Sequence, residues 1–293
     1  LRQVLSACER GLAVYCEKPI GMNLDEARRM AEAATQSGKT NHTAFTFRYR
    51  PCVRQARAMM AAGLIGEVRH FGARFYHSSY DDPARPISWR LKHNQSGGGA
   101  LADLGIHLID TLHLLLGDFS WIQCETRTFI TERPSSAGSA KMESVDVDDW
   151  ALCALGLRNG SAGSMEVSRV ASGNPNLMQI EIIGSKGTLR VDFAHDDTTE
   201  YFNSDDGLWK SGTHAIAELE NETPLKEIYP PSKHSLGSHF NSHLASAYDF
   251  IRRAQKNQLS NADFKAAARA QETLEAAYLS AAQQGSRISF PLP

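Results

Sequence analysis

The spacing of apolar residues changes along the chain, and its first part indicates a layered α/β fold. The apolar run Leu12–Cys16 predicts a buried strand that follows a short helix. Apolar residues repeat at helical spacing after a capping Asn23 and stop at Gly38, which predicts a complete helix. "TNHTAF", the segment opened by Pro51 and "GEVRHFGARFYHS" then predict a strand, a helix and a long strand. This alternation favours a mostly parallel sheet covered by helices.

The pattern differs beyond the polar loop Asp81–Gly99. Residues 100–116 form one strongly apolar helix, and strand-like runs separated by turn residues extend from Trp121 to Phe202. The "RNG" between two of these runs is typical of a hairpin. Two helices, Ser238–Gln255 and Ala262–Gln284, precede a closing strand "RISF". We therefore expect a large, mostly antiparallel open sheet after an α/β start, a fold that mixes the α/β and α+β classes.

Composition narrows the class of protein. The 293 residues are 42% hydrophobic and 22% charged, with a formal net charge of −2. No block of Lys and Arg provides the basic surface that nucleic-acid binding requires, so we expect no nucleic-acid partner. Apolar runs such as "LHLLLG" are far shorter than a bilayer span, and no signal-peptide pattern is present, so we expect no membrane and a cytoplasmic protein. The five cysteines are scattered without a CxxC pair, which predicts reduced thiols.

The apolar helix carries the most informative polar residues. Asp103, His107 and Asp110 are spaced i, i+4 and i+7, so they share one face of a helix that is otherwise apolar. Burying such groups is costly unless they are paired or used. Three interpretations are open: a satisfied core network, a set of metal ligands, or an acid–base pair of Asp103 and His107. Lys18, held rigidly at a strand end beside a proline, favours proton transfer over metal binding, and we expect no metal.

The segment "GGGALA", Gly97–Ala102, matches the G-x-G-x-x-A form of the dinucleotide fingerprint. The preceding residues "LKHNQS" do not predict a strand, and Asp118 lies at a helix end and not at the end of a second strand. We therefore do not interpret this segment as a phosphate-binding loop.

Several motifs in order resemble one family. "CEKPIG", "FRYRP", the "WR" at Trp89–Arg90, "GGGALADLGIHLID", "IIGSKGTLRVDF" and "AARAQETLEAAYLSAAQQGSRISF" together are similar to the glucose-fructose oxidoreductase / inositol dehydrogenase / MocA family. The resemblance spans almost the whole chain. It implies an NAD- or NADP-dependent oxidoreductase that acts on a sugar, inositol or related polyhydroxyl compound. It also implies a Rossmann domain followed by an α/β domain whose open sheet often forms a dimer interface.

The same resemblance implies roles for particular residues. Lys18, Asp103 and His107 match the family's catalytic set, and the Lys–Pro peptide bond is often cis there. We expect His107 to be the base, Lys18 to polarise the substrate oxygen and Asp103 to fix the pair; the family leaves open whether His or Lys takes the proton. The predicted cofactor contacts are Glu17, Lys18, Pro19, Trp89 and Arg90. The predicted substrate contacts are Arg48, Tyr49, Asp103 and His107. A helix-start role for Arg48 and a loop-anchor role for Trp89 are the structural alternatives.

The chain departs from the family at its start. Residues 1–45 resemble only the last elements of a Rossmann domain, and residues 46–293 resemble the substrate-binding and dimerisation domain. We expect the phosphate-binding half of the Rossmann domain to lie upstream of Leu1 in a longer enzyme. The alternatives are a non-catalytic sugar-binding or assembly protein of the same fold and a metal-dependent hydrolase or isomerase. The expected partners are a small-molecule polyol or sugar and further copies of the chain, in a homodimer or homotetramer formed through the C-terminal sheet.

Overall fold

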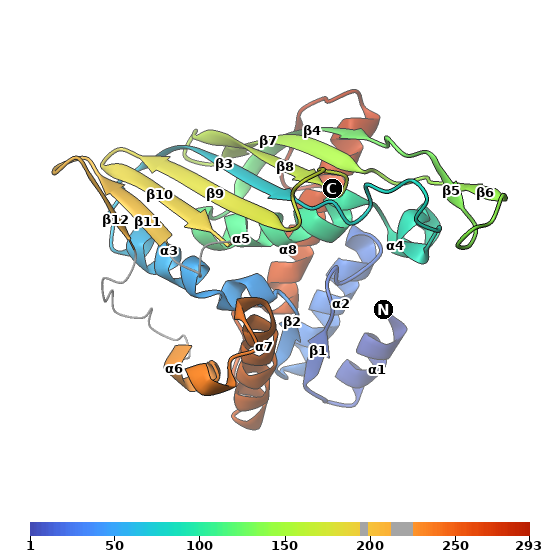
Figure 1. Cartoon of the computed structure of the whole chain (residues 1–293). Helices are drawn as coiled ribbons and strands as arrows, with labels where there is room; N and C mark the ends of the chain where they lie inside the picture. The colour runs from blue at the N-terminus through green and yellow to red at the C-terminus, as the bar shows by residue number, and fades with distance from the viewer. Residues whose placement is uncertain (194–198, 212–224) are drawn as a thin grey trace.

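The computed structural model describes residues 1–193, 199–211 and 225–293, and its first elements form a small parallel sheet (Figure 1). Strands β1 (Val14–Cys16) and β2 (Asn41–Thr43) pair in parallel, with helices α1 (Arg2–Glu9) and α2 (Leu24–Ser37) alongside. The predicted ends of α2 are confirmed. Asn23 Oδ1 accepts from the backbone N–H of Glu26 at 2.9 Å, and Gly38 ends the helix with a positive φ of 62°.

A nine-stranded sheet dominates the rest of the molecule, in the order β12-β11-β10-β9-β3-β8-β7-β4-β13. Among the described strands of this sheet, only β3 and β8 pair in parallel, which confirms the mostly antiparallel expectation. The strands are β3 (Val68–Tyr76), β4 (Phe119–Arg127), β7 (Trp150–Leu157), β8 (Ala162–Ser168), β9 (Leu177–Gly184), β10 (Gly187–Asp192), β11 (Thr199–Asn203), β12 (Leu208–Ser211) and β13 (Ile288–Ser289).

The assignment of the third strand to the first sheet was wrong. Strand β3 follows β2 and α3 (Pro51–Ala61) in the chain, as the alternating pattern predicted, but it lies inside the nine-stranded sheet between β9 and β8. Its buried residues, Phe71, Ala73 and Phe75, alternate with exposed or half-buried ones, so one face of β3 packs against helices. The parallel sheet of described residues is therefore two-stranded.

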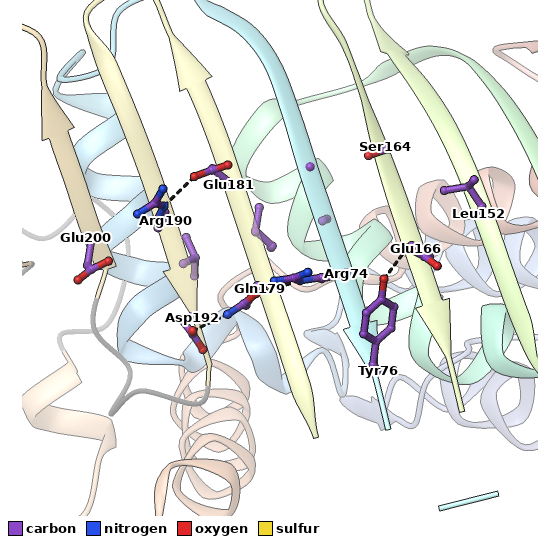
Figure 2. A pocket seen from close by; sticks show the side chains of 14 residues that line it. Arg74, Tyr76, Leu152, Ser164, Glu166, Gln179, Glu181, Arg190, Asp192 and Glu200 are labelled. Carbon is purple, nitrogen blue, oxygen red and sulfur yellow. Dashed lines mark hydrogen bonds and ion pairs between the residues drawn. The ribbon is translucent and has the colours of Figure 1, made fainter. Parts of the chain in front are cut away.

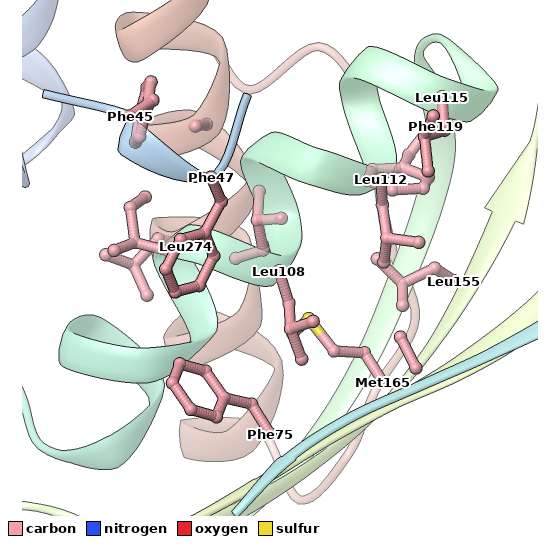
Figure 3. Packing of buried hydrophobic residues seen from close by; sticks show 14 of the residues in the cluster. Phe45, Phe47, Phe75, Leu108, Leu112, Leu115, Phe119, Leu155, Met165 and Leu274 are labelled. Atoms are coloured by element: carbon pink, nitrogen blue, oxygen red, sulfur yellow. The ribbon is translucent and has the colours of Figure 1, made fainter. Parts of the chain in front are cut away.

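Helices cover one face of the large sheet, and the opposite face is open (Figure 1). Helices α5 (Ile106–Leu116) and α8 (Phe264–Ala282) pack on this face and against each other, and Figure 3 shows Leu108 of α5 close to Met165 of β8. Helix α8 also packs against α2 and β2, so it joins the small sheet to the large one. Helix α7 (Ser238–Gln255) matches its predicted bounds.

The remaining short elements are found mainly in the connections. They are η1 (Thr46–Tyr49), η2 (Trp89–Leu91), α4 (His93–Ser96), η3 (Leu101–Gly105), β5 (Glu132–Pro134), β6 (Met142–Ser144), α6 (Leu225–Ile228) and η4 (Ser232–His234).

The helical stretch His93–Leu116 contains η3 and α5 and is the most apolar part of the chain. By length and composition alone it could cross a membrane, yet 78% of its most apolar window is buried inside the protein. This stretch packs against the large sheet and α8, which accounts for its composition. A helix that is apolar on nearly all sides is typical of a protein core.

Candidate active site

The end of β1 places a lysine beside the start of the apolar helix. Lys18 Nζ donates to Asp103 Oδ1 at 2.9 Å and to the backbone carbonyl of Asp103 at 3.0 Å. Only 16% of the Lys18 side chain is exposed, and the Lys18–Pro19 peptide bond is cis, as the resemblance implied. Two oxygens of one residue therefore fix the amine at the carboxyl end of a parallel strand, where open α/β sheets bind ligands.

Asp103 is positioned by the helix start that contains the three glycines. The segment η3 is a single π-helical turn, a feature frequent at functional sites. Asp148 accepts from the backbone N–H of Gly99 at 2.9 Å and of Leu101 at 2.8 Å, and the Tyr278 hydroxyl donates to it at 2.7 Å. A Cβ on Gly99 would lie 2.0 Å from the Asp148 carbonyl oxygen, so only glycine fits here. The glycines therefore serve close packing at the helix start.

A cavity of about 280 Å³ opens beside Lys18 and Asp103. It gathers most of the residues predicted for the site, because the loop that carries η2 folds over the end of β1. The predicted residues that line it are Glu17, Lys18, Pro19, Trp89, Arg90 and Asp103.

The Asp103 side chain is held as a carboxylate. Burial favours its neutral form, but the positive charges of Lys18 and Arg90, with a smaller contribution from His77, lower its pKa below the usual value for aspartate. The Asp103 carboxylate and the Lys18 amine form an ion pair at the cavity wall.

His107 lies one helical turn beyond Asp103 and is held neutral. Its ring stacks on Phe47 with 4.4 Å between centroids, and its Nδ1 is buried without a hydrogen-bond partner among the described residues. Burial, and then the charges of Lys18, His243 and His239, lower the pKa of His107 well below 6.5. A neutral imidazole can accept a proton or a hydrogen bond near pH 7. His107 does not appear among the residues that line the 280 Å³ cavity.

Asp110 and the two predicted substrate contacts in η1 lie in the interior. Arg48 Nε and Nη2 donate to the two Asp110 oxygens at 2.8 and 2.6 Å, and both side chains are at most 4% exposed. The Tyr49 hydroxyl donates to Asp249 at 2.8 Å and is also buried. Neither Arg48 nor Tyr49 lines the cavity. Asp110 is therefore paired with Arg48 in the core, as in the first of the three interpretations. It does not form one group with Asp103 and His107.

A set of metal ligands on the helix was another of the three interpretations. Within residues 1–193, 199–211 and 225–293, no group of three or more His, Cys, Asp or Glu side chains is placed to hold a metal ion.

Arg169 is the main residue that the sequence did not reveal. It follows β8 directly and lines the cavity, because β3 and β8 run in parallel and their carboxyl ends meet beside the helix start. The pairing of two strands separated by about ninety residues has no local sequence signal. The glycines Gly98 and Gly99 also line the cavity, and their close approach to Tyr278 and Asp148 explains why they are needed.

The fold, a small parallel sheet joined to a large and mostly antiparallel one, is that of a family of oxidoreductases. Residues 2–45 match the family described as "Oxidoreductase family, NAD-binding Rossmann fold", and residues 53–190 match the "GFO/IDH/MocA C-terminal domain". The two matches together cover more than half of the chain, which therefore belongs to the GFO/IDH/MocA family of oxidoreductases. The predicted family and the predicted fold class are confirmed.

Relatives within this family are sugar and inositol dehydrogenases. Levoglucosan dehydrogenase of Pseudarthrobacter phenanthrenivorans is 30% identical over 223 residues, which are 72% of this chain and 57% of that protein. The scyllo-inositol 2-dehydrogenase (NAD(+)) of Bacillus subtilis is 26% identical over 188 residues, 64% of this chain and 50% of that protein. The chain thus spans about half the length of these relatives.

A solved structure of levoglucosan dehydrogenase in complex with NADH and levoglucosan matches the whole chain in three dimensions. The TM-score is 0.87 at 26% identity, and the alignment covers 100% of this chain and 77% of the other.

Proposed function

We propose that the protein transfers a hydride between NAD or NADP and a C–OH group of a sugar, inositol or related polyhydroxyl substrate. The observation that carries this proposal is the Lys18 amine, held by Oδ1 and the backbone carbonyl of Asp103 at the wall of a cavity of about 280 Å³. A fixed ammonium group in a small polar cavity is suited to polarise one substrate hydroxyl. The solved relative with NADH and levoglucosan supports the same substrate class.

In the proposed mechanism His107 accepts the hydroxyl proton as the substrate is oxidised. Burial keeps its imidazole neutral at pH 7, so a ring nitrogen carries the free electron pair that accepts the proton. Lys18 donates a hydrogen bond to the same substrate oxygen and stabilises negative charge that develops on it. Asp103 keeps the Lys18 amine in place, so it acts on the reaction through Lys18.

The residues beside the cavity also suit a nicotinamide. Pro19 and the indole of Trp89, which is 52% exposed, provide flat apolar surface next to Lys18, and the guanidinium of Arg90 lies 4.5 Å from the Trp89 ring. We propose that Glu17, Lys18, Pro19, Trp89 and Arg90 contact the cofactor, as predicted. When bound, the nicotinamide supplies the hydride acceptor.

The test is turnover of the full-length protein with NAD or NADP on levoglucosan, D-xylose and scyllo-inositol. Nicotinamide absorbance reports the reaction, and Lys18→Ala should abolish it while leaving the thermal unfolding midpoint close to that of the wild type. Arg158→Ala, at an exposed hairpin turn, is the matched control that should retain activity. Sugar binding without any effect of NAD or NADP would contradict the proposal and support the non-catalytic alternative.

We also propose that copies of the chain associate through the open face of the large sheet. No helix of the described residues covers this face, and a depression of about 630 Å³ crosses β3, β8, β9 and β10 (Figure 2). Its side chains are already paired across strands, as in the 2.7 Å ion pair of Arg190 with Glu181, and Leu152 is 42% exposed among them. A face of neutralised charges around an apolar residue suits association of two identical sheets.

Light scattering tests this proposal. Leu152→Arg should shift a homodimer or homotetramer towards smaller species, whereas Leu259→Arg, in the exposed connection between α7 and α8, should not. A monomeric wild type, or equal behaviour of the two variants, would contradict it.

We further propose a cytoplasmic location. The five cysteines are free thiols, which is consistent with that location.

A further inference from the structure

Arg169 lines the cavity and carries a guanidinium N–H group without a hydrogen-bond partner among the described residues. Its side chain is only 4% exposed, and its Nη2 is buried without a hydrogen-bond partner among the described residues. Arg169 nevertheless lines the same cavity as Lys18 and Asp103. A buried guanidinium N–H without an acceptor costs free energy, and an oxygen atom of a ligand in this cavity would recover it.

The guanidinium is fixed from two sides. Nε donates to Asp149 Oδ1 at 2.9 Å, and the guanidinium lies 5.0 Å from the Tyr80 ring centroid. Asp149 is itself held by the backbone N–H groups of Phe129 and Ile130 at 2.8 and 2.9 Å. The donor is therefore preorganised and loses little entropy when it binds a ligand.

The charge of the cavity wall favours an uncharged acceptor. Each buried cation already has its own carboxylate, since Lys18 pairs with Asp103 and Arg169 pairs with Asp149. The remaining charged side chains at the wall, Arg90 and Glu17, are both exposed and opposite in sign. A carboxylate or phosphate on the substrate would find no uncompensated buried cation, whereas a hydroxyl or ring oxygen needs only the donor.

We propose that Arg169 binds a second oxygen of the substrate and selects an uncharged polyhydroxyl compound in a defined orientation at Lys18. This role rests on the proposed function and deepens it. Lys18 engages the reacting oxygen, and Arg169 engages a hydroxyl or ring oxygen elsewhere on the same molecule. Two fixed donors on one small substrate determine which of its carbons faces the cofactor.

The test compares Arg169→Met with the wild-type full-length protein on levoglucosan, D-glucose, D-xylose and scyllo-inositol. Loss of one hydrogen bond from a charged donor should raise KM for the preferred sugar roughly ten- to hundredfold, with a smaller change in kcat. Arg169→Lys keeps a charge beside Asp149 but loses the planar guanidinium, so it should show the same rise in KM. This variant tests the proposal if Arg169→Met does not fold. The matched control is Arg85→Met, because Arg85 lies over the same Tyr80 ring but is exposed and outside the cavity.

Single-deoxy analogues of the preferred sugar identify the bonded oxygen. One analogue should be a poor substrate of the wild-type protein. Its KM should change little in Arg169→Met, because the variant and the analogue remove the same hydrogen bond. D-glucuronate should be a poorer substrate than D-glucose. Faster turnover of the uronate, or an equal effect of the variant on every analogue, would overturn the proposal.

Binding measurements separate this proposal from the proposed function. If both Arg169 variants oxidise the sugar with the same kcat and KM as the wild-type protein, the proposed function stands and the role of Arg169 is overturned. Weakened NADH binding with unchanged sugar KM would assign the residue to the cofactor and also overturn it. If calorimetry with NADH present shows no sugar binding to the wild type and no sugar is oxidised, both proposals fail.

Discussion

His42 should make the free energy of unfolding depend on pH. The residue lies in β2 with no exposed surface; its Nε2 is 3.0 Å from the Ser246 hydroxyl and its Nδ1 is 2.7 Å from the Ser260 hydroxyl. Its ring also stacks on Tyr15 with 5.1 Å between centroids. Burial lowers the pKa of His42 from 6.5 to about 3, and the nearby Asp249 opposes this only in part. Both ring nitrogens are thus used in the neutral state.

The direction of this pH dependence follows from the uptake of a proton by the unfolded chain. Between pH 6.5 and about 3 the unfolded chain binds a proton at His42 that the folded protein does not bind, so stability falls as the pH falls through this range. At pH 5.0 the protonated fraction of the unfolded histidine corresponds to a loss of about 2 kcal/mol relative to pH 7.5. His113, whose pKa burial also lowers to about 3, should contribute a loss of similar size.

Urea unfolding of the wild type and of His42→Gln at pH 7.5 and pH 5.0 measures this effect. The Gln variant should be less stable at pH 7.5, because it loses the stacking on Tyr15, but its loss between the two pH values should be about 2 kcal/mol smaller than that of the wild type. His70→Gln, at an exposed position in β3, reports any general effect of replacing a histidine. An equal pH dependence in the wild type and His42→Gln would refute the reasoning.

Three further predictions concern the site and its support. Gly99→Ala should destabilise the protein by about 2 kcal/mol or more and reduce activity, because its Cβ would lie 2.0 Å from the Asp148 carbonyl; thermal unfolding and turnover measure both. Asp110→Asn should cost roughly 3–5 kcal/mol in urea unfolding, because Arg48 would stay buried without its counter-charge. The acid limb of kcat/KM should begin below pH 6.5, since burial lowers the pKa of His107 and it loses its basic form only in more acidic solution. A limb above pH 6.5 would argue against His107 as the base.

Local signals in the sequence were sufficient for most helices and strands. Asn23 and Gly38 mark the two ends of α2 through a side-chain cap and a left-handed residue, both of which depend only on neighbours in the chain. The alternation of buried and half-buried residues in β9 likewise indicates a strand with one face in the core. These features act over a few residues, so a single sequence contains them.

The contacts that the sequence did not reveal join distant segments. Arg48 pairs with Asp110 on α5, and nothing near Arg48 in the chain indicates that pairing; its predicted contact with the substrate stays a prediction. Arg169 reaches the cavity only because β8 runs parallel to β3, in a sheet whose other described pairs are antiparallel. Both cases depend on the order of strands and helices in space.

The proposed site depends on how firmly three distant segments are joined. Lys18 comes from the end of β1, Asp103 from the π-helical turn and Arg169 from the end of β8, so none of them can position the others through the local chain. Adjacent residues of one short segment link two of these segments: Asp148 bonds the helix start that carries Asp103, and Asp149 bonds Arg169. A shift of this segment would move the partner of Lys18 and the second proposed donor together. The "VDVDDW" segment therefore has a positioning role, although neither carboxylate lines the cavity.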